Sequence, residues 1–367
     1  MMGTARRLLD RWRGSGRHAA TVPPMDGILA PNQVIEEARL VLDIEEPDNL
    51  VSAGGHVLYS TRADVMRLPA RTENLNPVRV AGFDSDVSAL AAKDGVIAVG
   101  LETGGVRIVG GNRDGTVIRQ VGERPVLCPT ALLVSDNDSL IVALGSQHNP
   151  PSLWRHDLMQ KNASGSVWRI DLGSGEARCL ADRLAWPCGI LKRQDGSLVV
   201  SESWRSRILE LKPDGGTAAV LSDIAGYPGR LADAPDGGAW LSVFAPRSQL
   251  VEFVLREDDY RLSMMAEVDP QFWIAPLLSA NRSFLEPMQL GGLKQLGMIK
   301  PWSPTRSYGL VIGLDEAMRP RESFHSRADG RRHGITSALE IDGALLATSK
   351  GGGSIVSIDL ERERAAA

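Results

Sequence analysis

Six short segments of the chain repeat one pattern: a turn residue or two, then a strand of small and β-branched residues, with polar side chains near the start of the strand. The segments are PDNLVS (47–52), SDVSAL (85–90), CPTALL (128–133), PCGILK (187–192), PGRLAD (228–233) and HGITSA (333–338). Their polar residues are Asp48, Asn49, Asp86, Thr130, Cys188, Arg230, His333 and Thr336. If the fold brings the six strands together, these side chains form one ring with acid, imidazole and guanidinium groups.

Such a ring has the chemistry to hydrolyse an ester or a lactone. His333 is predicted to be the general base that activates water, because the unperturbed pKa of imidazole lies in the working range. Asp48 or Asp86 would orient that base, and Arg230 would stabilise the developing oxyanion. Contacts with the substrate are predicted for Asn49, Asp86, Thr130, Cys188, Thr336 and, from an insertion, Trp273.

The same residues also have structural interpretations. Asp48 and Asn49 can cap the turn before their strand. Cys188, between a proline and a glycine, can be a small buried filler. Arg230 needs an anionic partner if it points into a narrow channel, and an aspartate of the ring or a substrate carboxylate can supply it.

A longer repeat predicts the elements that position the ring. Six times, a short apolar strand runs into a polar turn and then into a second strand, over 56–68, 96–109, 140–172, 198–211, 239–253 and 345–360. A strand-rich repeat of roughly 40 to 50 residues is typical of a β-propeller. We therefore expect an all-β fold, a six-bladed β-propeller over 36–367. The strand at 38–44 either opens blade one or closes the ring beside the C-terminal strand.

Composition narrows the class of protein. Of the 367 residues 43% are hydrophobic, which is ample for a core, and a net charge of −4 without a basic stripe gives no support to nucleic-acid binding. No stretch approaches the eighteen or so apolar residues of a membrane-spanning helix. Three cysteines favour a reducing compartment over a disulfide framework. We expect a cytoplasmic protein, without stable membrane insertion, that acts on a small molecule.

Two insertions interrupt the repeat and are predicted to lie over one face of the propeller. The first, 147–165, contains a short helix around SLWRHDLMQ. The second, 268–305, is apolar, and Pro270, Pro276 and Pro287 divide it into short helices. A helical cover of this kind would select a hydrophobic substrate and exclude water. Alternatively it packs on the side of the ring or in a homodimer interface.

Residues 1–35 are predicted to precede the propeller. Leu8, Leu9 and Trp12 among arginines indicate a short basic amphipathic helix, and a proline-rich, extended lead-in follows it. Such a helix can contact an anionic membrane surface or a partner, or pack on its own domain.

Three segments carry a family resemblance. LAWPCGILKRQDGSLVVSESWRSRILELK (184–212), YPGRLADAPDGGAWLSVFAPRS (227–248) and RRHGITSALEIDGALLATSKGGGSIVSIDL (331–360) resemble the fourth, the next and the closing blade of strictosidine synthase-like proteins. The resemblance covers most of the chain from about residue 40. It extends more weakly to the gluconolactonase (SMP-30) and paraoxonase groups of the same six-bladed superfamily, and it implies a propeller.

The catalytic patterns of that superfamily are incomplete in this chain. The resemblance places Thr336 where strictosidine synthase has its glutamate, and a hydroxyl does not serve as a general base near neutral pH. The superfamily's metal-dependent lactonases hold a divalent cation with Glu, Asn and Asp side chains. Asp48 and Asn49 match that set, but its fifth-blade acid falls at Gly229, with the cationic Arg230 beside it. The third-blade and fourth-blade positions, Thr130 and Cys188, fail as well. We expect no bound calcium and no cofactor.

Two other functions stay open. One is a lyase or condensing enzyme of the strictosidine synthase type, in which Asp48 or Asp86 replaces the missing glutamate. The other is a non-catalytic propeller that binds a small molecule, which the loss of both catalytic patterns favours.

Overall fold

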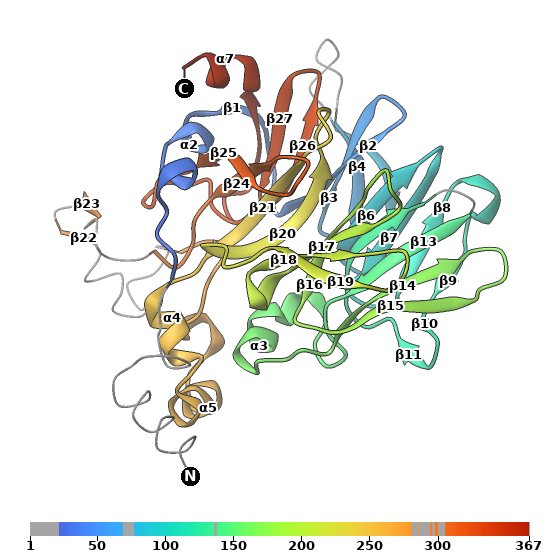
Figure 1. Cartoon of the computed structure of the whole chain (residues 1–367), viewed down its shortest axis with the longest axis horizontal. Coiled ribbons are helices and arrows are strands. Elements are labelled where there is room, and N and C mark those ends of the chain that lie inside the picture. Colours follow the sequence, from blue (N-terminus) through green and yellow to red (C-terminus); the bar gives the residue numbers. More distant parts are fainter. Residues whose placement is uncertain are drawn as a thin grey trace.

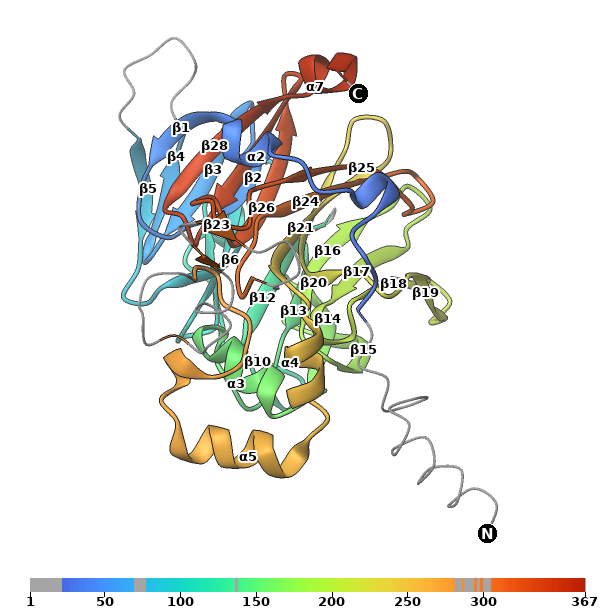
Figure 2. The same cartoon turned by 90° about the vertical axis from the view of Figure 1, so that its left-hand side faces the viewer.

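The predicted propeller is the fold of the chain (Figures 1 and 2). The computed structural model describes residues 22–68, 77–135, 138–280, 286, 294–295, 298–299 and 305–366. Six antiparallel sheets of four strands each form the blades. The innermost strands contact one another in a closed circle, in the order β2, β6, β12, β16, β20, β26 and back to β2. This circle surrounds the central channel.

Blades one to three follow one another along the chain. Blade one contains β2 (Pro47–Ala53), β3 (His56–Thr61), β4 (Asp64–Arg67) and β5 (Val78–Gly82). Blade two contains β6 (Val87–Lys93), β7 (Val96–Leu101), β8 (Val106–Val109) and β9 (Val117–Ile118), with η3 (Gly111–Arg113) before β9. A small ribbon of β10 (Gln120–Val121) and β11 (Arg124–Pro125) leads to blade three. Blade three contains β12 (Pro129–Val134), β13 (Ser139–Leu144), β14 (Gly165–Asp171) and β15 (Ala177–Leu184).

Blades four to six complete the ring. Blade four contains β16 (Pro187–Lys192), β17 (Leu198–Glu202), β18 (Arg207–Leu211) and β19 (Thr217–Leu221), with η5 (Ser203–Arg205) after β17. Blade five contains β20 (Gly226–Asp233), β21 (Ala239–Pro246), β24 (Leu310–Leu314) and β25 (Pro320–His325). Blade six contains β26 (Ile335–Ile341), β27 (Ala344–Ser349), β28 (Ser354–Asp359) and β1 (Arg39–Asp43), and α7 (Leu360–Ala366) follows β28.

The strand β1 closes the ring. It pairs antiparallel with β28, from Arg39 opposite Ser357 to Asp43 opposite Ser354. Of the two alternatives predicted for residues 38–44, the strand therefore closes the ring beside the C-terminal strand. Before it lie η2 (Gly27–Leu29) and α2 (Val34–Glu37). The side chain of Ile35 is fully buried in the cluster between blades five and six. The last blade therefore joins residues from both ends of the sequence.

The sequence interpretation of residues 239–253 as two strands is wrong in its second half. β21 is followed by a helix, α4 (Gln249–Val254), and the third strand of blade five is β24, some sixty residues later. Ser248 begins α4 because its Oγ accepts a hydrogen bond from the Val251 amide, as an N-cap does. Val251 and Val254 are buried at helical spacing. The second insertion thus starts before residue 268, and it lies inside blade five.

The two insertions pack together as one cover on the same face of the propeller (Figure 2). The first contributes η4 (Pro151–Leu153) and α3 (Trp154–Met159). The second contributes α4, α5 (Asp258–Glu267), η6 (Pro270–Phe272), β22 (Lys294–Gln295) and β23 (Met298–Ile299). Arg155 Nη1 donates to the Pro270 carbonyl at 2.9 Å, and the rings of His156 and Trp273 lie edge to face at 4.6 Å. The predicted helices after residue 280 fall largely outside the described residues.

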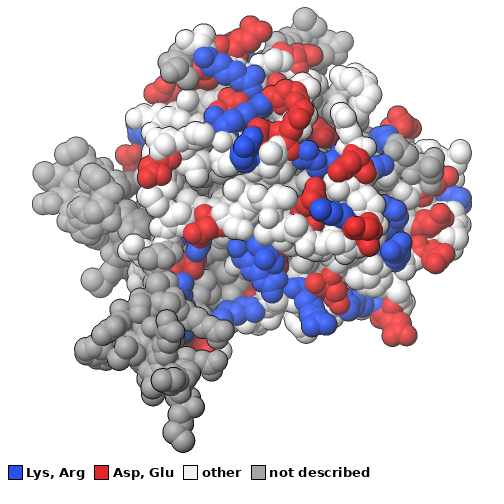
Figure 3. All heavy atoms as spheres, viewed as in Figure 1, with Lys and Arg blue, Asp and Glu red and all other residues white. Residues whose placement is uncertain are grey.

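Two other predictions concern membranes and the N-terminus. The amphipathic helix around Leu8, Leu9 and Trp12 lies outside the described residues. Across the part of the chain that is described, no helix combines the length and the apolar character needed to cross a bilayer. On the face that Figure 3 shows, lysine and arginine side chains are interspersed with acidic ones over the described surface, in keeping with the small net charge of −4.

The burial of Ile35 generates a first prediction. Ile35→Ala should lower the free energy of unfolding by about 2–5 kcal/mol, because it leaves a cavity between blades five and six. Ile28→Ala is the matched control: Ile28 lies in the same lead-in and is 52% exposed, so its loss should change stability by at most about 0.5 kcal/mol. Urea denaturation of both variants measures the difference. Equal stabilities would show that the lead-in does not help to close the ring.

Candidate functional site

A β-bulge near the start of every innermost strand builds the ring of side chains. In all six blades the register between the first and second strands shifts at this point, because the first strand carries one residue more than the second. A bulge re-aims the side chain that it carries. The residues at the skips are Asn49 and Leu50, Ser88, Thr130, Cys188, Gly229 and Arg230, and Thr336. The six segments that the sequence repeat predicts to be equivalent therefore share the same backbone bulge.

Hydroxyl groups on the first or second strand of a blade tie neighbouring blades together at five junctions of this ring. Each contact is a short hydrogen bond between a Ser or Thr hydroxyl and the backbone of the adjacent blade. The contacts are Ser88 Oγ to Pro129 O (2.7 Å), Thr130 Oγ1 to Pro187 O (2.5 Å), Ser201 Oγ to Gly229 O (2.5 Å), Ser242 Oγ to Thr336 O (3.0 Å) and Leu50 N to Ser337 Oγ (2.9 Å). The channel wall is thus held rigid by polar contacts that leave few free donors.

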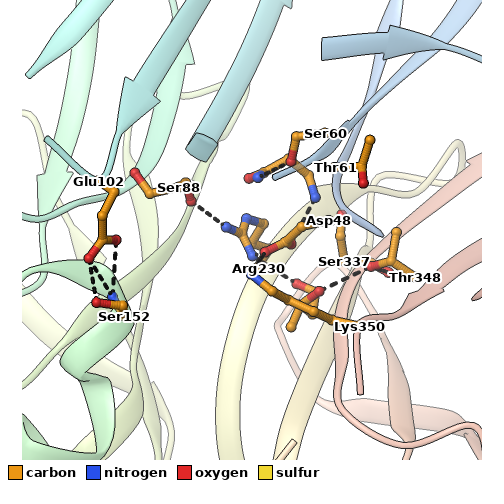
Figure 4. Close-up of polar contacts among 12 residues, drawn as sticks. Asp48, Ser60, Thr61, Ser88, Glu102, Ser152, Arg230, Ser337, Thr348 and Lys350 are labelled. Carbon is orange, nitrogen blue, oxygen red and sulfur yellow. Dashed lines mark hydrogen bonds and ion pairs between the residues drawn. The ribbon is translucent and has the colours of Figure 1, made fainter. Parts of the chain in front are cut away.

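Arg230 reaches across the channel from blade five and contacts three other blades (Figure 4). Its Nη1 lies 2.8 Å from Asp48 Oδ1 of blade one and 3.2 Å from the Thr336 carbonyl of blade six. Its Nη2 donates to the Ser88 carbonyl of blade two at 2.7 Å. The Arg230 side chain is only 17% exposed. The anionic partner that a buried guanidinium needs is therefore Asp48.

Asp48 lies between two cations. Besides Arg230, Lys350 Nζ approaches its second oxygen, Oδ2, at 3.3 Å (Figure 4). Burial alone would raise the pKa of the Asp48 carboxyl, but Arg230, Lys350 and hydrogen bonds from Thr336 and the Asn49 amide outweigh it and lower this pKa. Asp48 is thus a carboxylate at neutral pH. With two cations and one anion, this centre carries a net positive charge.

Close backbone packing places Arg230 beside Cys188. A Cβ atom added to Gly189 would come within 2.7 Å of the Gly229 carbonyl oxygen and 3.0 Å of Arg230 Cα, so only glycine allows blade four to approach blade five here. The Cys188 thiol is buried next to this contact, and its burial raises its pKa. A thiol in that state is a poor nucleophile, which agrees with its interpretation as a small filler.

The structure does not bring every predicted site residue to the centre. Asp86 is exposed two residues before the bulge, and Ser88 holds the blade-two position instead. His333 is buried two residues before β26, where its Nε2 donates to the Arg327 carbonyl and its Nδ1 faces Ser307 Oγ, both at 2.7 Å. Neither Arg327 nor Ser307 is part of the ion pair between Asp48 and Arg230. With both ring nitrogens engaged, His333 has no free lone pair to offer water.

The remaining predicted contacts are buried in or near the wall. Thr130 and Thr336 use their hydroxyls for contacts with neighbouring strands, and Asn49 Nδ2 donates to Ser60 Oγ at 2.8 Å. The Asn49 Oδ1 atom is buried without a hydrogen-bond partner among the described residues. Trp273 is buried in the cover, where its Nε1 donates to the Val268 carbonyl.

Lys350 is a site residue that the sequence reasoning missed. It directly follows β27, the second strand of its blade, at the cover side of the channel. The position after the second strand repeats in every blade, so the same repeat contained the signal. The residues there are Arg62, Glu102, Gly145, Ser203, Arg247 and Lys350. Lys350 cannot be found from the polar residues of the innermost strands alone.

Aromatic rings form a roof beside this centre, between the blades and the cover. Trp204 stacks on Trp186 at 5.2 Å and on Trp154 of α3 at 6.3 Å, and it meets Phe244 edge to face. Trp204 Nε1 also donates to Asp157 of α3 at 2.9 Å. The cover is fixed on the opposite side by Glu102 of blade two, which accepts hydrogen bonds from Ser152 (Figure 4). Trp204 thus lies under the cover.

A calcium site of the kind that the family resemblance implies does not fit these residues. The oxygen atoms that a cation would need, Asp48 Oδ1 and the carbonyls of Ser88 and Thr336, already accept hydrogen bonds from Arg230. Calcium takes six to eight oxygen ligands. No group of three or more His, Cys, Asp or Glu side chains suited to a metal occurs in the described ranges.

A pocket of about 740 Å³ opens elsewhere, where the lead-in passes the start of α4. Its wall includes Met25, Asn32, Ser248, Tyr308 and Arg327, and none of its lining residues belongs to the ring. We place the candidate site in the channel, where charged groups from blades one, five and six converge around Asp48.

The fold is a six-bladed propeller, and solved gluconolactonase structures share this architecture. A gluconolactonase from Xanthomonas campestris superposes with a TM-score of 0.55 at 12% identity, covering 87% of both chains. The calcium-binding protein regucalcin from Agrobacterium tumefaciens gives 0.53 at 10% identity over 88% of this chain and 92% of that one. A chain of a nidogen/laminin complex gives 0.51 at 14% identity over 84% and 90%. Identities this low show the fold alone.

The resemblance to the strictosidine synthase-like proteins is confirmed in one segment. The protein strictosidine synthase-like 8 of Arabidopsis thaliana is 30% identical over 95 residues. The match spans only a quarter of that relative's length and a quarter of this chain. No family model matches the chain.

The charge arrangement predicts how Asp48→Asn will behave with pH. At neutral pH this variant should be less stable by about 3–5 kcal/mol, because Arg230 keeps its buried charge without an anionic partner. The folded-state pKa of Asp48 is below its unfolded value of about 3.9. Its carboxylate therefore contributes stability above about pH 4 and loses it as the pH falls through the folded pKa. Urea denaturation from about pH 8 downward should show the difference constant and then shrinking below pH 4.

Asp86→Asn is the control for this series. It removes an exposed carboxylate that lies outside the bulge, so its stability should match that of the wild type within about 0.5 kcal/mol. A loss in Asp86→Asn as large as in Asp48→Asn would contradict the ring geometry.

The position of Arg230 also generates a prediction about metals. Treatment with a chelator should leave both the melting temperature and any turnover unchanged, because Arg230 occupies the oxygen ligands that calcium would use. Differential scanning calorimetry before and after dialysis against EDTA tests this. About one calcium per chain, lost together with activity, would restore the metal-dependent mechanism.

Proposed function

We propose that this protein is an enzyme that hydrolyses an ester or lactone bond in a small hydrophobic molecule bound at the channel. The observation that supports the proposal most is the pair of cations, Arg230 and Lys350, held around one carboxylate beside an aromatic roof. Their side chains are 17% and 27% exposed, so both cations are in contact with solvent. Preorganised cations in a partly buried site stabilise developing negative charge strongly.

Each of the three charged groups has a separate role. Arg230 is fixed by blades one, two and six, so it presents its charge without reorganisation when the carbonyl oxygen becomes an oxyanion. Lys350 is the more exposed cation and can move from Asp48 to the substrate. Asp48 then orients the attacking water, accepts its proton as the water oxygen bonds to the carbonyl carbon, and returns that proton to the alcohol oxygen when the ester bond breaks.

The roof suggests the class of substrate. Trp154 and Trp204 are partly exposed, and they lie against Trp186, Cys188 and Phe244. Flat apolar groups pack well on such rings. An aryl ester or an alkyl-substituted lactone has an apolar part for the roof and one carbonyl for the cations.

His333 has no role in this proposal, in contrast to the expectation from the sequence. Its nitrogens hold Ser307 and the Arg327 carbonyl in place. Burial lowers the pKa of this imidazole below that of an exposed one. We assign it a structural part at the junction of blades five and six.

A non-catalytic binding protein is the second candidate. The lowered pKa of Asp48 favours it, because a strongly ion-paired carboxylate is a weak base. The same fact disfavours a condensing enzyme of the strictosidine synthase type, since Asp48 would hold no proton to transfer near neutral pH.

The proposal predicts the outcome of an assay with a panel of lactones and aryl esters. The wild type should turn over at least one aromatic or alkyl-substituted member. Lys350→Gln should lower kcat by about 100-fold with a small change in KM, because it removes a charge that acts on the transition state. Arg319→Gln, which removes an exposed arginine in the β24–β25 turn, is the charge-matched control and should leave kcat unchanged.

His333→Ala separates this proposal from a mechanism with a histidine base. If the folded variant keeps the wild-type kcat, the imidazole is not the base. A fall of a hundredfold or more with an unchanged melting temperature would return His333 to the mechanism. Tight binding of panel members without turnover would favour the binding protein instead.

A further inference from the structure

A second, smaller pocket lies between blades three and four at the end of the propeller opposite the cover. Its volume is about 230 Å³. The turn after β14 and the turns that join β16 to β17 and β18 to β19 all lie at this end, because each is one strand length away from the cover side. Gly196, Gly215 and Gly216 of these turns line the pocket. It is therefore separate from the channel centre.

The lining of this pocket is cationic. Arg169, Arg178 and Lys212 line it, and no acidic residue does. Arg169 and Arg178 are direct cross-strand partners on β14 and β15. Like charges in this arrangement repel each other and destabilise the sheet. Within the described ranges, none of the three side chains forms a hydrogen bond or an ion pair with protein.

The acidic residues nearby are already occupied by their own turns. Asp171 Oδ1 accepts hydrogen bonds from the amides of Gly173 and Ser174. Asp195 and Asp214 accept from amides two residues later in the same way. Glu210 alternates with Leu211 along β18 and so points to the other face of blade four. These carboxylates thus bond with their own turns and not with the three cations, whose N–H groups are left for a ligand.

The floor of the pocket is apolar. Leu198 and Leu211 are paired across β17 and β18, and Leu180 faces them from blade three. Arginine side chains above such a floor extend their carbon stems over it and keep their guanidinium groups at the rim. A ligand with an anionic head and a short apolar body would contact both parts.

We propose that this pocket binds a small organic anion, a phosphate monoester or a carboxylate, through Arg169, Arg178 and Lys212. Arginine pairs form parallel hydrogen bonds with the oxygens of either group. The volume is below the usual 300–1,000 Å³ of pockets for larger ligands, so only a small molecule fits. Binding would cancel the repulsion between the two arginines and stabilise the blade. The site is independent of the function proposed for the channel.

Isothermal titration calorimetry of the full chain with phenyl phosphate, benzoate and neutral benzyl alcohol tests the proposal. At least one of the two anions should bind, and which one identifies the head group; benzyl alcohol should not bind. Arg178→Gln should weaken the Kd at least tenfold, and without ligand its melting temperature should equal or exceed that of the wild type, because the repulsion is gone. A merely structural arginine would give the opposite change in stability.

Two control variants test whether binding is specific to this pocket. Arg183→Gln removes an exposed arginine of the same strand outside the pocket, and it should bind the anion like the wild type. Lys350→Gln reports on the channel centre, which is also cationic, and it should leave the Kd unchanged. The proposal is overturned if neither anion binds, if Arg183→Gln weakens binding as much as Arg178→Gln, or if Lys350→Gln abolishes it.

Discussion

The ion pair between Arg230 and Asp48 is the contact on which the centre of the propeller depends. The guanidinium of Arg230 joins blade five to blades one, two and six. It connects blades across the channel, where strands do not pair with each other. Breaking such a buried pair leaves a charge without compensation, which is far costlier than losing a surface contact. The belt of hydroxyl groups around it then links neighbouring blades. Together they connect the inner parts of the six sheets around a charged centre, while apolar clusters join the blade faces.

The same ion pair decides what chemistry the channel supports. A guanidinium carries one charge spread over directional donors, whereas a divalent metal accepts many oxygens from any direction. Oxygen atoms of the channel wall accept hydrogen bonds from Arg230, so contacts with three blades fix the orientation of its guanidinium. Lys350, on the cover side, is the freer cation. A site with one fixed and one movable cation is suited to a carbonyl that becomes negative during reaction. The aromatic roof supplies the low-polarity surroundings in which such charges act most strongly.

The sequence predicted the architecture well because each blade repeats the same physical solution. Alternating apolar strands and glycine turns recur at a steady spacing, and the closing strand is one of the two alternatives for residues 38–44. Blade five was the exception: the helix α4 follows β21 directly, so its apolar residues resembled a further strand. In the site, Asp48 is one of the two aspartates predicted to pair with Arg230, since an arginine directed into a channel requires an acid. Asp86 lies two residues before the bulge of its strand and His333 lies three residues before its own, and the repeat alone does not show where a register skip falls.

The pairing of β1 with β28 has a consequence for how the protein is made. Leu40 lies opposite Val356, so the contact that completes blade six joins residues more than three hundred positions apart. During synthesis β1 leaves the ribosome early, and its partner strand follows only after all the other blades. Until then β1 is an unpaired strand with an open edge, exposed to wrong pairing with other chains. Ring closure is therefore a late event with a high loop-closure cost. A chain cut short before β26 would release a five-bladed intermediate in which blades one and five both expose the apolar face that packs against blade six in the closed ring.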